Sequence, residues 1–292
     1  MIRIALIGFG EVGQTLAEDF LALGEASLSA FDIKFSDPES GPMRATRRLD
    51  MVEACRSATE AVRDADLVLS AVTAERTFDA AQSVVGHLKP DTWYVDLNSA
   101  SPQTKIDAAA SINAAGGRYV ETSIMSPIGP KRLQSPMLAG GTHAKDFAAL
   151  AQKVGMTGLS VFSDIYGQAS AAKMCRSVIV KGFEALITES LVSAKHYGVE
   201  DTVVASLSDL FPGLNWGDLS AYMISRALKH GRRRAEEMRE VAKTVADADM
   251  VPLLSEAIAK RQDWSADLGI NGESSSLAEL LTTISQKKEG LS

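Results

Sequence analysis

The feature that most constrains the fold is a short apolar run that ends in a glycine-rich turn and continues into a helical pattern. Residues 2–7 read IRIALI, the composition of a parallel strand that is buried on both faces. The next six residues are GFGEVG, in which Gly8, Gly10 and Gly13 have G-x-G-x-x-G spacing. Gly8 permits a tight turn, Gly10 allows a phosphate to approach the backbone, and Gly13 lets helix and strand pack closely. This pattern predicts a strand–turn–helix unit that binds a dinucleotide.

An acidic residue at the end of the next predicted strand supports the same interpretation. The segment SLSAFD ends at Asp32, roughly 20 residues after the last glycine of the turn, where a carboxylate can accept both ribose hydroxyls. Asp32 favours NAD, because a carboxylate repels the 2′-phosphate of NADP. Four basic residues could receive that phosphate instead, or form a solvated loop and helix face: Lys34, Arg44, Arg47 and Arg48. The alternative to the whole interpretation is a glycine-rich turn in a sheet protein that binds no nucleotide.

Strand and helix patterns continue to alternate up to about residue 165. A further buried strand is predicted at 66–72, and more strands are predicted at 92–97, 118–125, 136–141 and 159–162. Helices are predicted after the capping box that begins at Ser57, from about Glu75, after Ser101-Pro102, and from about His143. Ligands of open α/β sheets bind beyond the carboxyl ends of the strands. The polar residues expected on that rim are Thr73, Asn98, Ser99 and Ser126, although each could equally be a turn residue or a helix cap.

A stretch of about thirty residues without proline, 167–197, predicts one long helix that carries Lys173 in its first turns. Only helical patterns follow it, around 201–210, 218–246 and 251–268, and the final dozen residues are polar and expected to fray. The predicted fold is therefore an α/β Rossmann-type doubly wound sheet at 1–165, followed by an all-α domain at 166–292, with the long helix joining the two.

Composition narrows the class of protein. The chain has 292 residues and a net charge of −7, which favours neither nucleic acid nor an anionic membrane as a partner. No apolar run approaches the roughly 20 residues that span a bilayer, and no signal-peptide pattern precedes the first strand. Cys55 and Cys175 have no metal-ligand spacing, and Cys175 is most simply a buried small residue. We therefore expect a cytoplasmic protein that acts on a small molecule without a metal.

Taken together, the glycine loop, the rim residues and the segment GQASAAK at 167–173 resemble the β-hydroxyacid dehydrogenase family. That family includes 3-hydroxyisobutyrate and 6-phosphogluconate dehydrogenases, and the imine reductases are its relatives. In the family, a G-x-G-x-x-x-K segment opens the long interdomain helix, and its lysine is the catalytic acid/base. Gly167 and Lys173 match this pattern, whereas Ala169 replaces its second glycine. The resemblance implies hydride transfer between NAD(P) and a hydroxy acid or a related alcohol or carbonyl compound. It also implies a homodimer formed through the C-terminal helices.

Two departures from the family pattern leave the substrate open. Ser177 stands where the family usually has an asparagine, four residues after the lysine. The family's substrate loop, D-x-P-V-S-G-G, is replaced by residues 121–129, in which Met125 occupies the place of the carboxylate-binding serine and Ser126 comes one residue later. This loop is more similar to that of imine reductases, which usually lack the lysine. An imine or ketimine reductase, and a non-catalytic dinucleotide sensor, therefore remain alternatives.

Several residues could act beside the lysine. To act as a general base, Lys173 needs a pKa near neutrality, and burial of its amine would lower the pKa in that direction. Alternatively, Lys173 is an ordinary helix lysine whose amine reaches water. Ser177, at i+4, shares its helix face, and Arg176 could bind a carboxylate or form a surface ion pair. The charged run 230–237 is predicted to be a solvated face with Arg232–Glu236 and Arg233–Glu237 pairs. Alternatively, His230 or one of the arginines reaches a neighbouring subunit's cleft.

The predicted site can be stated as two sets of residues. The cofactor-binding set is Gly8, Phe9, Gly10, Glu11, Val12, Gly13, Asp32, Lys34, Val72, Thr73 and Asn98. The substrate-binding set is Asn98, Ser99, Ser126, Arg176, Ser177 and His230, with Lys173 as the catalytic residue.

Overall fold

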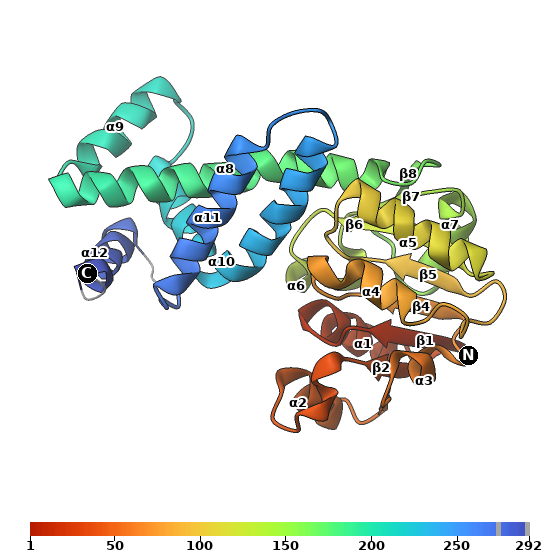
Figure 1. Ribbon diagram of the computed structural model, residues 1–292. Coiled ribbons are helices and arrows are strands. Elements are labelled where there is room, and N and C mark those ends of the chain that lie inside the picture. Colours follow the sequence, from red (N-terminus) through yellow and green to blue (C-terminus); the bar gives the residue numbers. More distant parts are fainter. Residues whose placement is uncertain (273–275, 290–292) are drawn as a thin grey trace. The chain divides into compact units, whose positions relative to one another are not determined.

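The computed structural model describes residues 1–272 and 276–289, with side chains up to Lys288 in the second range. The chain divides into two compact units, Met1–Lys173 and Met174–Ser292. The boundary falls inside the long helix α8 (Gln168–Tyr197), which belongs to both (Figure 1).

The first unit is built on one eight-stranded sheet. In chain order its strands are β1 (Ile2–Ile7), β2 (Ala26–Phe31), β3 (Val52–Ala54), β4 (Leu67–Ser70), β5 (Trp93–Asp96), β6 (Arg118–Ile124), β7 (Met137–Gly140) and β8 (Leu159–Ser163). They lie side by side in the order β3-β2-β1-β4-β5-β6-β7-β8, and neighbouring strands are parallel except for the antiparallel pair β6–β7. The chain reverses direction across the sheet between β1 and β4, which is the switch point at which doubly wound sheets bind ligands.

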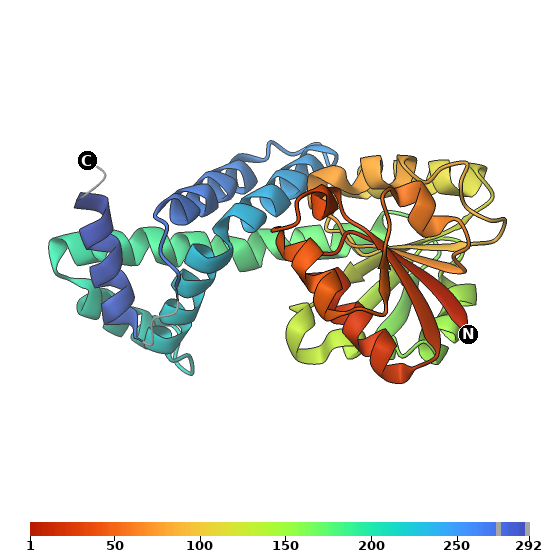
Figure 2. The same ribbon diagram turned by 90° about the horizontal axis from the view of Figure 1, so that it is seen from below.

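Helices cover both faces of this sheet. The helices of the first unit are α1 (Glu11–Leu23), η1 (Ile33–Ser36), α2 (Gly41–Arg48), α3 (Ala58–Val62), η2 (Ala74–Arg76), α4 (Thr77–Gln82), α5 (Pro102–Ala114), α6 (Ile128–Lys131), η3 (Arg132–Gln134) and α7 (Ala144–Lys153). One apolar layer contains residues of α1, α6 and α7, and the opposite layer contains residues of α3, α4 and α5. Figure 2 shows α4 and α5, in orange and yellow, on one side of the fan of strands. Because both faces are covered, strands such as β4, LVLS, are buried along their whole length.

The second unit is helical in its described part. It contains the end of α8 together with α9 (Glu200–Leu210), α10 (Trp216–Ala246), α11 (Leu253–Asp267) and α12 (Leu277–Glu289). Two apolar clusters hold it together, one between α8, α10 and α12 and one between α8, α10 and α11. At Gly231 a Cβ atom would lie 2.4 Å from the carbonyl oxygen of Gln262, so glycine is what allows α10 and α11 to pack so closely.

The predicted fold class is confirmed: a Rossmann-type sheet precedes a helical region, and one long helix joins them. The structure adds one strand for which no prediction was made, and it contradicts one local prediction. The short edge strand β3 was not expected, since three residues are too few to form an apolar run. The end of the chain is not frayed up to residue 289, because α12 buries Leu280, Leu281 and Ile284 against α8 and α10. Within the described residues, no helix is long and apolar enough to cross a membrane.

Candidate functional site

The glycine loop lies at the carboxyl end of β1 and opens α1. Gly8 has a φ of +93°, and a Cβ atom there would lie 2.3 Å from the carbonyl oxygen of Ala71. A Cβ atom at Gly13 would lie 2.3 Å from the carbonyl oxygen of Gly8. At Gly10, by contrast, no atom of the described chain lies within 4 Å of the Cβ position. Two of the three glycines are thus required by packing, and the third leaves open space beside the backbone.

This open space suits a pyrophosphate. Gly10 is the N-cap of α1, and no side chain in the described part of the chain caps the helix there. The first intrahelical hydrogen bond runs from Gln14 N–H to Gly10 O at 3.0 Å, so the amides of Glu11 and Val12 precede the helical ladder. Such amides, at the positive end of the helix dipole, bind phosphate oxygens. The site's own geometry therefore fits the diphosphate of a dinucleotide.

Asp32 has a structural task that the sequence does not reveal. Its Oδ2 accepts the Phe9 N–H at 2.8 Å and its Oδ1 accepts the Lys34 N–H at 2.9 Å, so the carboxylate ties the glycine loop to the start of η1. A carboxylate has about four acceptor positions. Two remain for ribose hydroxyls after these two bonds. Asp32 is only partly buried, so a sugar could reach it.

A series of direct contacts connects the glycine loop with Lys173 inside the first unit. The Gly8 backbone abuts Ala71 and Val72 at the end of β4. The Val72 N–H donates to Asn98 Oδ1 at 2.6 Å, at the end of β5. The adjacent residue, Ser99, accepts a hydrogen bond from Lys173 Nζ at 2.7 Å. The ends of β1, β4 and β5 and the start of α8 thus form one connected polar edge.

Asn98 and Ser99 have different surroundings at this edge. Asn98 is buried, and its side chain is held at both ends, by the Val72 N–H and by a 3.0 Å bond from Nδ2 to Ser70 Oγ. Ser99 is partly exposed and contacts the lysine. Thr73, at the N-cap of η2, is exposed on the same rim.

Ser126 lies just after β6, in a loop that is tied to α1. Its own hydroxyl donates to Pro127 O at 3.2 Å. Farther along the loop, Arg132 has a φ of +51°, unusual for a residue with a side chain. The Arg132 guanidinium donates to Asp19 at 2.5 Å and to Glu18 at 2.8 Å. These bonds connect the loop after β6 with the helix that begins at the glycine loop.

The remaining predicted residues lie in the second unit. Arg176 is exposed, whereas Ser177 is buried and accepts a hydrogen bond from Lys181 Nζ at 3.1 Å. Lys181 also pairs with Glu237 on α10 at 2.8 Å. Cys175 is exposed, so the prediction that it is buried is wrong; its position on α8 turns it away from the cluster that holds Met174.

His230 is partly buried on α10. Burial, followed by the charge of Arg226, lowers the pKa of His230 to about 4, so the imidazole is neutral near pH 7. The predicted Arg233–Glu237 pair is present, at 2.9 Å. Arg232, however, forms ion pairs with Asp263 and Asp267 of α11. The expectation of a self-paired helix face is therefore wrong for Arg232, because α11 packs beside α10 and offers carboxylates.

Sequence reasoning missed the buried polar groups beneath the edge. Lys105 is fully buried and donates to Asp96 Oδ1 at 2.6 Å, and Tyr119 donates to Asp96 Oδ2 at 2.7 Å. Glu121 is also fully buried, and it contacts the start of α8. The sequence did contain one sign of this: Glu121 is a charged residue inside the otherwise largely uncharged strand β6. Charged residues are rarely buried unless they have a partner or a function.

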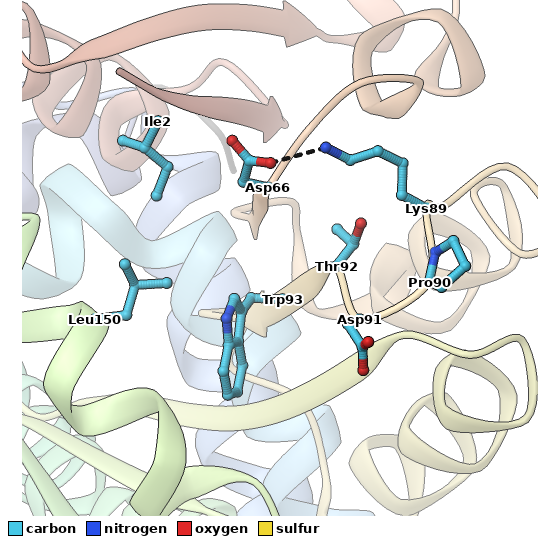
Figure 3. A pocket seen from close by; sticks show the side chains of 8 residues that line it. All are labelled: Ile2, Asp66, Lys89, Pro90, Asp91, Thr92, Trp93 and Leu150. Carbon is cyan, nitrogen blue, oxygen red and sulfur yellow. Dashed lines mark hydrogen bonds and ion pairs between the residues drawn. The ribbon is translucent and has the colours of Figure 1, made fainter.

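A surface hollow lies at the other end of the strands, next to the amino-terminal ends of β1, β4 and β5 (Figure 3). It is lined by Ile2, Asp66, Lys89, Pro90, Asp91, Thr92, Trp93 and Leu150. Asp66 and Lys89 pair with each other at 2.8 Å, and Asp91 pairs with Arg118 at 2.7 Å. Because ligands of such sheets bind at the carboxyl ends, this hollow is not the candidate site. Among the described residues, no group of three or more His, Cys, Asp or Glu side chains could hold a metal.

Comparison with known proteins supports the assignment of the first unit as a dinucleotide-binding domain. The family described as the NAD binding domain of 6-phosphogluconate dehydrogenase matches residues 3–154, and a domain of unknown function matches residues 194–265. A conserved hypothetical protein from Sinorhizobium meliloti 1021 is 33% identical, with coverage of 98% of this chain and 97% of that chain and a TM-score of 0.75. An uncharacterized 28.5 kDa protein from Methanothermus fervidus is 28% identical over 87% of this chain and 94% of its own.

More distant solved structures share the fold. Mycobacterium tuberculosis 3-hydroxyisobutyrate dehydrogenase, solved with L-serine, is 18% identical, with coverage of 98% and 99% of the two chains and a TM-score of 0.72. An imine reductase from Myxococcus stipitatus, solved with NADP+, is 15% identical, with coverage of 97% and 99% and a TM-score of 0.55. The match over residues 3–154, the relative at 33% identity and the shared fold agree: the chain belongs to the β-hydroxyacid dehydrogenase-like family.

Proposed function

We propose that this protein is a dehydrogenase or reductase that transfers hydride between a nicotinamide cofactor and a hydroxy acid or a related alcohol or carbonyl compound. Membership of the family supports a nicotinamide cofactor and oxidoreductase chemistry. The observation that carries the proposal is the series of contacts from the glycine loop through Val72 and Asn98 to Ser99 and Lys173. It brings a phosphate-binding turn and an amine to one edge of the sheet.

Lys173 is the general acid/base in this proposal. When bound, the nicotinamide supplies the hydride donor or acceptor. Lys173 Nζ takes the hydroxyl proton during oxidation and returns it during reduction, which requires the amine to lie within hydrogen-bond reach of the substrate oxygen. Ser99 Oγ, at 2.7 Å from Nζ, holds the amine at the end of β5. Ser126, Arg176, Ser177 and His230 remain candidates for contacts to the rest of the substrate.

Turnover of hydroxy acids by a lysine variant tests this role. Lys173→Ala is expected to lower kcat about 10²- to 10⁴-fold, the usual contribution of a positioned acid/base, and to leave the Kd of the cofactor nearly unchanged. Lys145→Ala, which alters an exposed lysine on α7 of the same unit, is the matched control. A Lys173→Ala protein with the turnover of the control would refute the proposed role.

NAD is the favoured cofactor. Asp32 keeps acceptor capacity for ribose hydroxyls at the end of β2. Two of the basic residues that could bind a 2′-phosphate already contact acidic residues: Arg44 Nη1 lies 4.0 Å from a Glu39 oxygen and Arg48 Nη1 lies 2.6 Å from a Glu18 oxygen. These surface pairs are weak, so they reduce the attraction for a 2′-phosphate without abolishing it.

Calorimetry with NAD(H) and NADP(H) in parallel tests the cofactor. We expect wild type to bind NAD(H) more tightly and Asp32→Asn to lose most of that preference. Asparagine keeps the size and one acceptor oxygen of Asp32, so it disturbs the Phe9 contact less than alanine would. Asp37→Asn is the control, since Asp37 also accepts a backbone N–H, from Glu39 at 2.9 Å, but lies outside the loop. Tighter NADP(H) binding that survives Asp32→Asn would assign the site to Lys34 and its neighbours. No binding of either cofactor would overturn the proposal.

An imine or ketimine reductase is the second candidate. The loop after β6 carries Met125 and Ser126 in place of the family's substrate-loop pattern, and imine reductases share the fold. This candidate predicts NADPH-dependent turnover of cyclic imines that survives Lys173→Ala. A dinucleotide sensor without catalytic activity, the third candidate, predicts cofactor binding with no turnover of either substrate class.

The functional assembly in this proposal is a homodimer. In the second unit, α8 exposes three apolar residues at i, i+4 and i+7 spacing, Ile179, Phe183 and Leu186, with exposed fractions of 66%, 41% and 69%. Such a stripe on one helix face is typical of an interaction surface. The resemblance to a family of dimers supports a second copy of this chain as the partner.

A further inference from the structure

Glu121 places a carboxylate directly at the start of α8. It lies in β6, where it is paired with Asp96 of β5, and its side chain is fully buried. Its Oε2 accepts the Gly167 N–H at 2.6 Å, and its Oε1 accepts the Ser170 N–H at 2.5 Å. A strand residue 46 positions upstream of Gly167 therefore binds two amides at the start of the helix.

These two amides are the ones that a helix normally satisfies with its own side chains. The first intrahelical bond runs from Ala171 N–H to Gly167 O at 2.8 Å, which makes Gly167 the N-cap and Ser170 the third helical residue. In a capping box, one side chain serves the third amide and another serves the N-cap amide. Gly167 has no side chain, and Glu121 serves both amides. Its negative charge also lies at the positive end of the helix dipole.

The surrounding glycines leave room for this arrangement. Gly167 has a φ of +89°, which a side chain would strain. A Cβ atom at Gly140, the β7 partner of Glu121, would lie 3.0 Å from Glu121 Oε2. The glutamate therefore fills a space made by glycine, and a larger neighbour at residue 140 would push the carboxylate away from the helix.

The capped turn leads directly to Lys173. Ser170 lies three residues earlier, on the same helix face, and its hydroxyl donates to the Ala100 carbonyl oxygen. Lys173 Nζ donates to Ser99. Two adjacent residues of the loop after β5 thus receive hydrogen bonds from residues 170 and 173. The position of the first two turns of α8 against this loop depends on how the helix start is held.

Groups inside the same unit act on the pKa of Glu121 in both directions, and their net effect raises it. Burial raises its pKa, while the nearby Lys105 ammonium and the two helix amides act in the opposite direction, and Asp96 raises it further. Lys105 is bonded to Asp96, not to Glu121. The direct partners of the Glu121 carboxylate are therefore the helix amides, so its charge acts on α8.

We propose that Glu121 is the positioning residue of Lys173: by capping α8 from β6, it sets where the lysine amine meets Ser99. This inference rests on the proposed function for the role of Lys173, but the contact itself exists without cofactor or substrate. Glu121→Gln replaces one acceptor oxygen by an NH2 group that faces an N–H, so at least one buried amide loses its partner.

Two measurements on the cofactor-free protein test the proposal. The lysines are dimethylated with ¹³C-formaldehyde, and the Lys173 methyl signal is identified by its loss in Lys173→Arg. In Glu121→Gln, we expect this signal and its pH titration to shift. We also expect amide hydrogen exchange at residues 167–171 to accelerate on the order of tenfold or more, as loss of a charge-assisted hydrogen bond implies.

Glu60→Gln is the matched control, because Glu60 accepts the Arg56 N–H at 2.7 Å just before α3. It should leave both the Lys173 signal and exchange in α8 unchanged. If Glu121→Gln does not fold, Glu121→Asp retains the charge and shortens the side chain by one methylene. Its exchange at 167–171 should still exceed that of wild type.

Wild-type exchange and an unshifted Lys173 signal in a folded Glu121 variant would overturn the inference. Faster exchange with an unshifted lysine signal would also overturn it, because Glu121 would then cap the helix without positioning the amine. Turnover that survives Lys173→Ala would refute the proposed function separately, since neither measurement on Glu121 uses a substrate.

Discussion

At the scale of single residues, Gly8 is the position where a side chain is least tolerable. Gly8→Ala combines a φ of +93° with a Cβ atom 2.3 Å from a backbone oxygen. Gly24→Ala is a matched control, with a φ of +71° and no described atom within 4 Å. We expect Gly24→Ala to cost about 1–2 kcal/mol of unfolding free energy, and Gly8→Ala about 1–3 kcal/mol more. If chemical denaturation shows the same loss of unfolding free energy in both variants, the turn at Gly8 changes its backbone conformation to make room for the added Cβ atom.

His230 predicts a pH dependence of stability. Its folded-state pKa is about 4, below the ordinary value of 6.5, because burial and nearby cations oppose its charge. Between these values the unfolded chain binds a proton that the folded chain does not, so stability falls as the pH drops through this window. His230→Gln should remove part of that loss in denaturation curves measured from pH 7 to 4. His196→Gln, which alters an exposed histidine on α8, should not.

Arg226, Arg233, Arg234 and Lys229 are the cations that disfavour protonation of His230. If wild type and His230→Gln lose stability in parallel between pH 6.5 and 4, the imidazole is not protected from protonation.

At the scale of elements, Arg132 tests how the loop after β6 is held to α1. Its φ of +51° suits glycine, whereas its guanidinium binds Asp19 and Glu18. Arg132→Gly and Arg132→Ala both remove the ion pairs, but only alanine keeps the backbone strain. The glycine variant should therefore be about 1–2 kcal/mol more stable than the alanine variant. Equal stability of the two in denaturant would indicate that the loop relaxes once the ion pairs are lost.

The same loop contributes to acid sensitivity. Hydrogen bonds from Arg132 and then Arg48 lower the pKa of Glu18 below 4.5. A lowered carboxylate pKa gives stability above the unfolded value that is lost as the pH falls through the folded value. Both Arg132 variants should therefore lose less stability than wild type below about pH 4.5.

Most elements could be predicted from sequence because their signals are local. The run IRIALI, the glycine spacing and the proline after Ser101 each determine the structure of adjacent residues, and the corresponding strands and helices are confirmed. β3 and the end of α12 were missed because their stability comes from neighbours distant in sequence: β2 for the strand, α8 and α10 for the helix.

The same distinction applies to the candidate site. The glycines, Asp32 and Lys173 follow from motifs. Glu121 could not be assigned a role, because its partners Gly167 and Ser170 lie in another element. The Arg232 pairs with α11 were missed for the same reason. A contact between distant elements leaves at most an indirect sign in the sequence, such as a charge in an apolar strand.

At the scale of the whole molecule, fold and chemistry are separable. The family and the carboxyl-end location of the site point to hydride transfer, but one fold accepts many substrates. In the proposed function, we expect substrate specificity to come from the loop after β6, where Met125 departs from the family pattern, and from α8, where Ser177 does. A screen of hydroxy acids, aldehydes and cyclic imines should therefore precede any mutagenesis of the substrate residues.

The oligomeric state tests the exposed stripe formed by Ile179, Phe183 and Leu186 on α8. One chain is 31.1 kDa, and light scattering should find about twice that mass if the exposed stripe on α8 is an interface. Leu186→Glu places a charge in this stripe, which would have to lose water in the dimer, so the dimer should dissociate toward the monomer mass. Leu23→Glu, at the exposed end of α1 in the first unit, is the control and should remain dimeric. A Leu186→Glu protein that keeps the dimer mass would exclude the stripe as the interface, and a wild type with monomer mass would exclude the dimer itself.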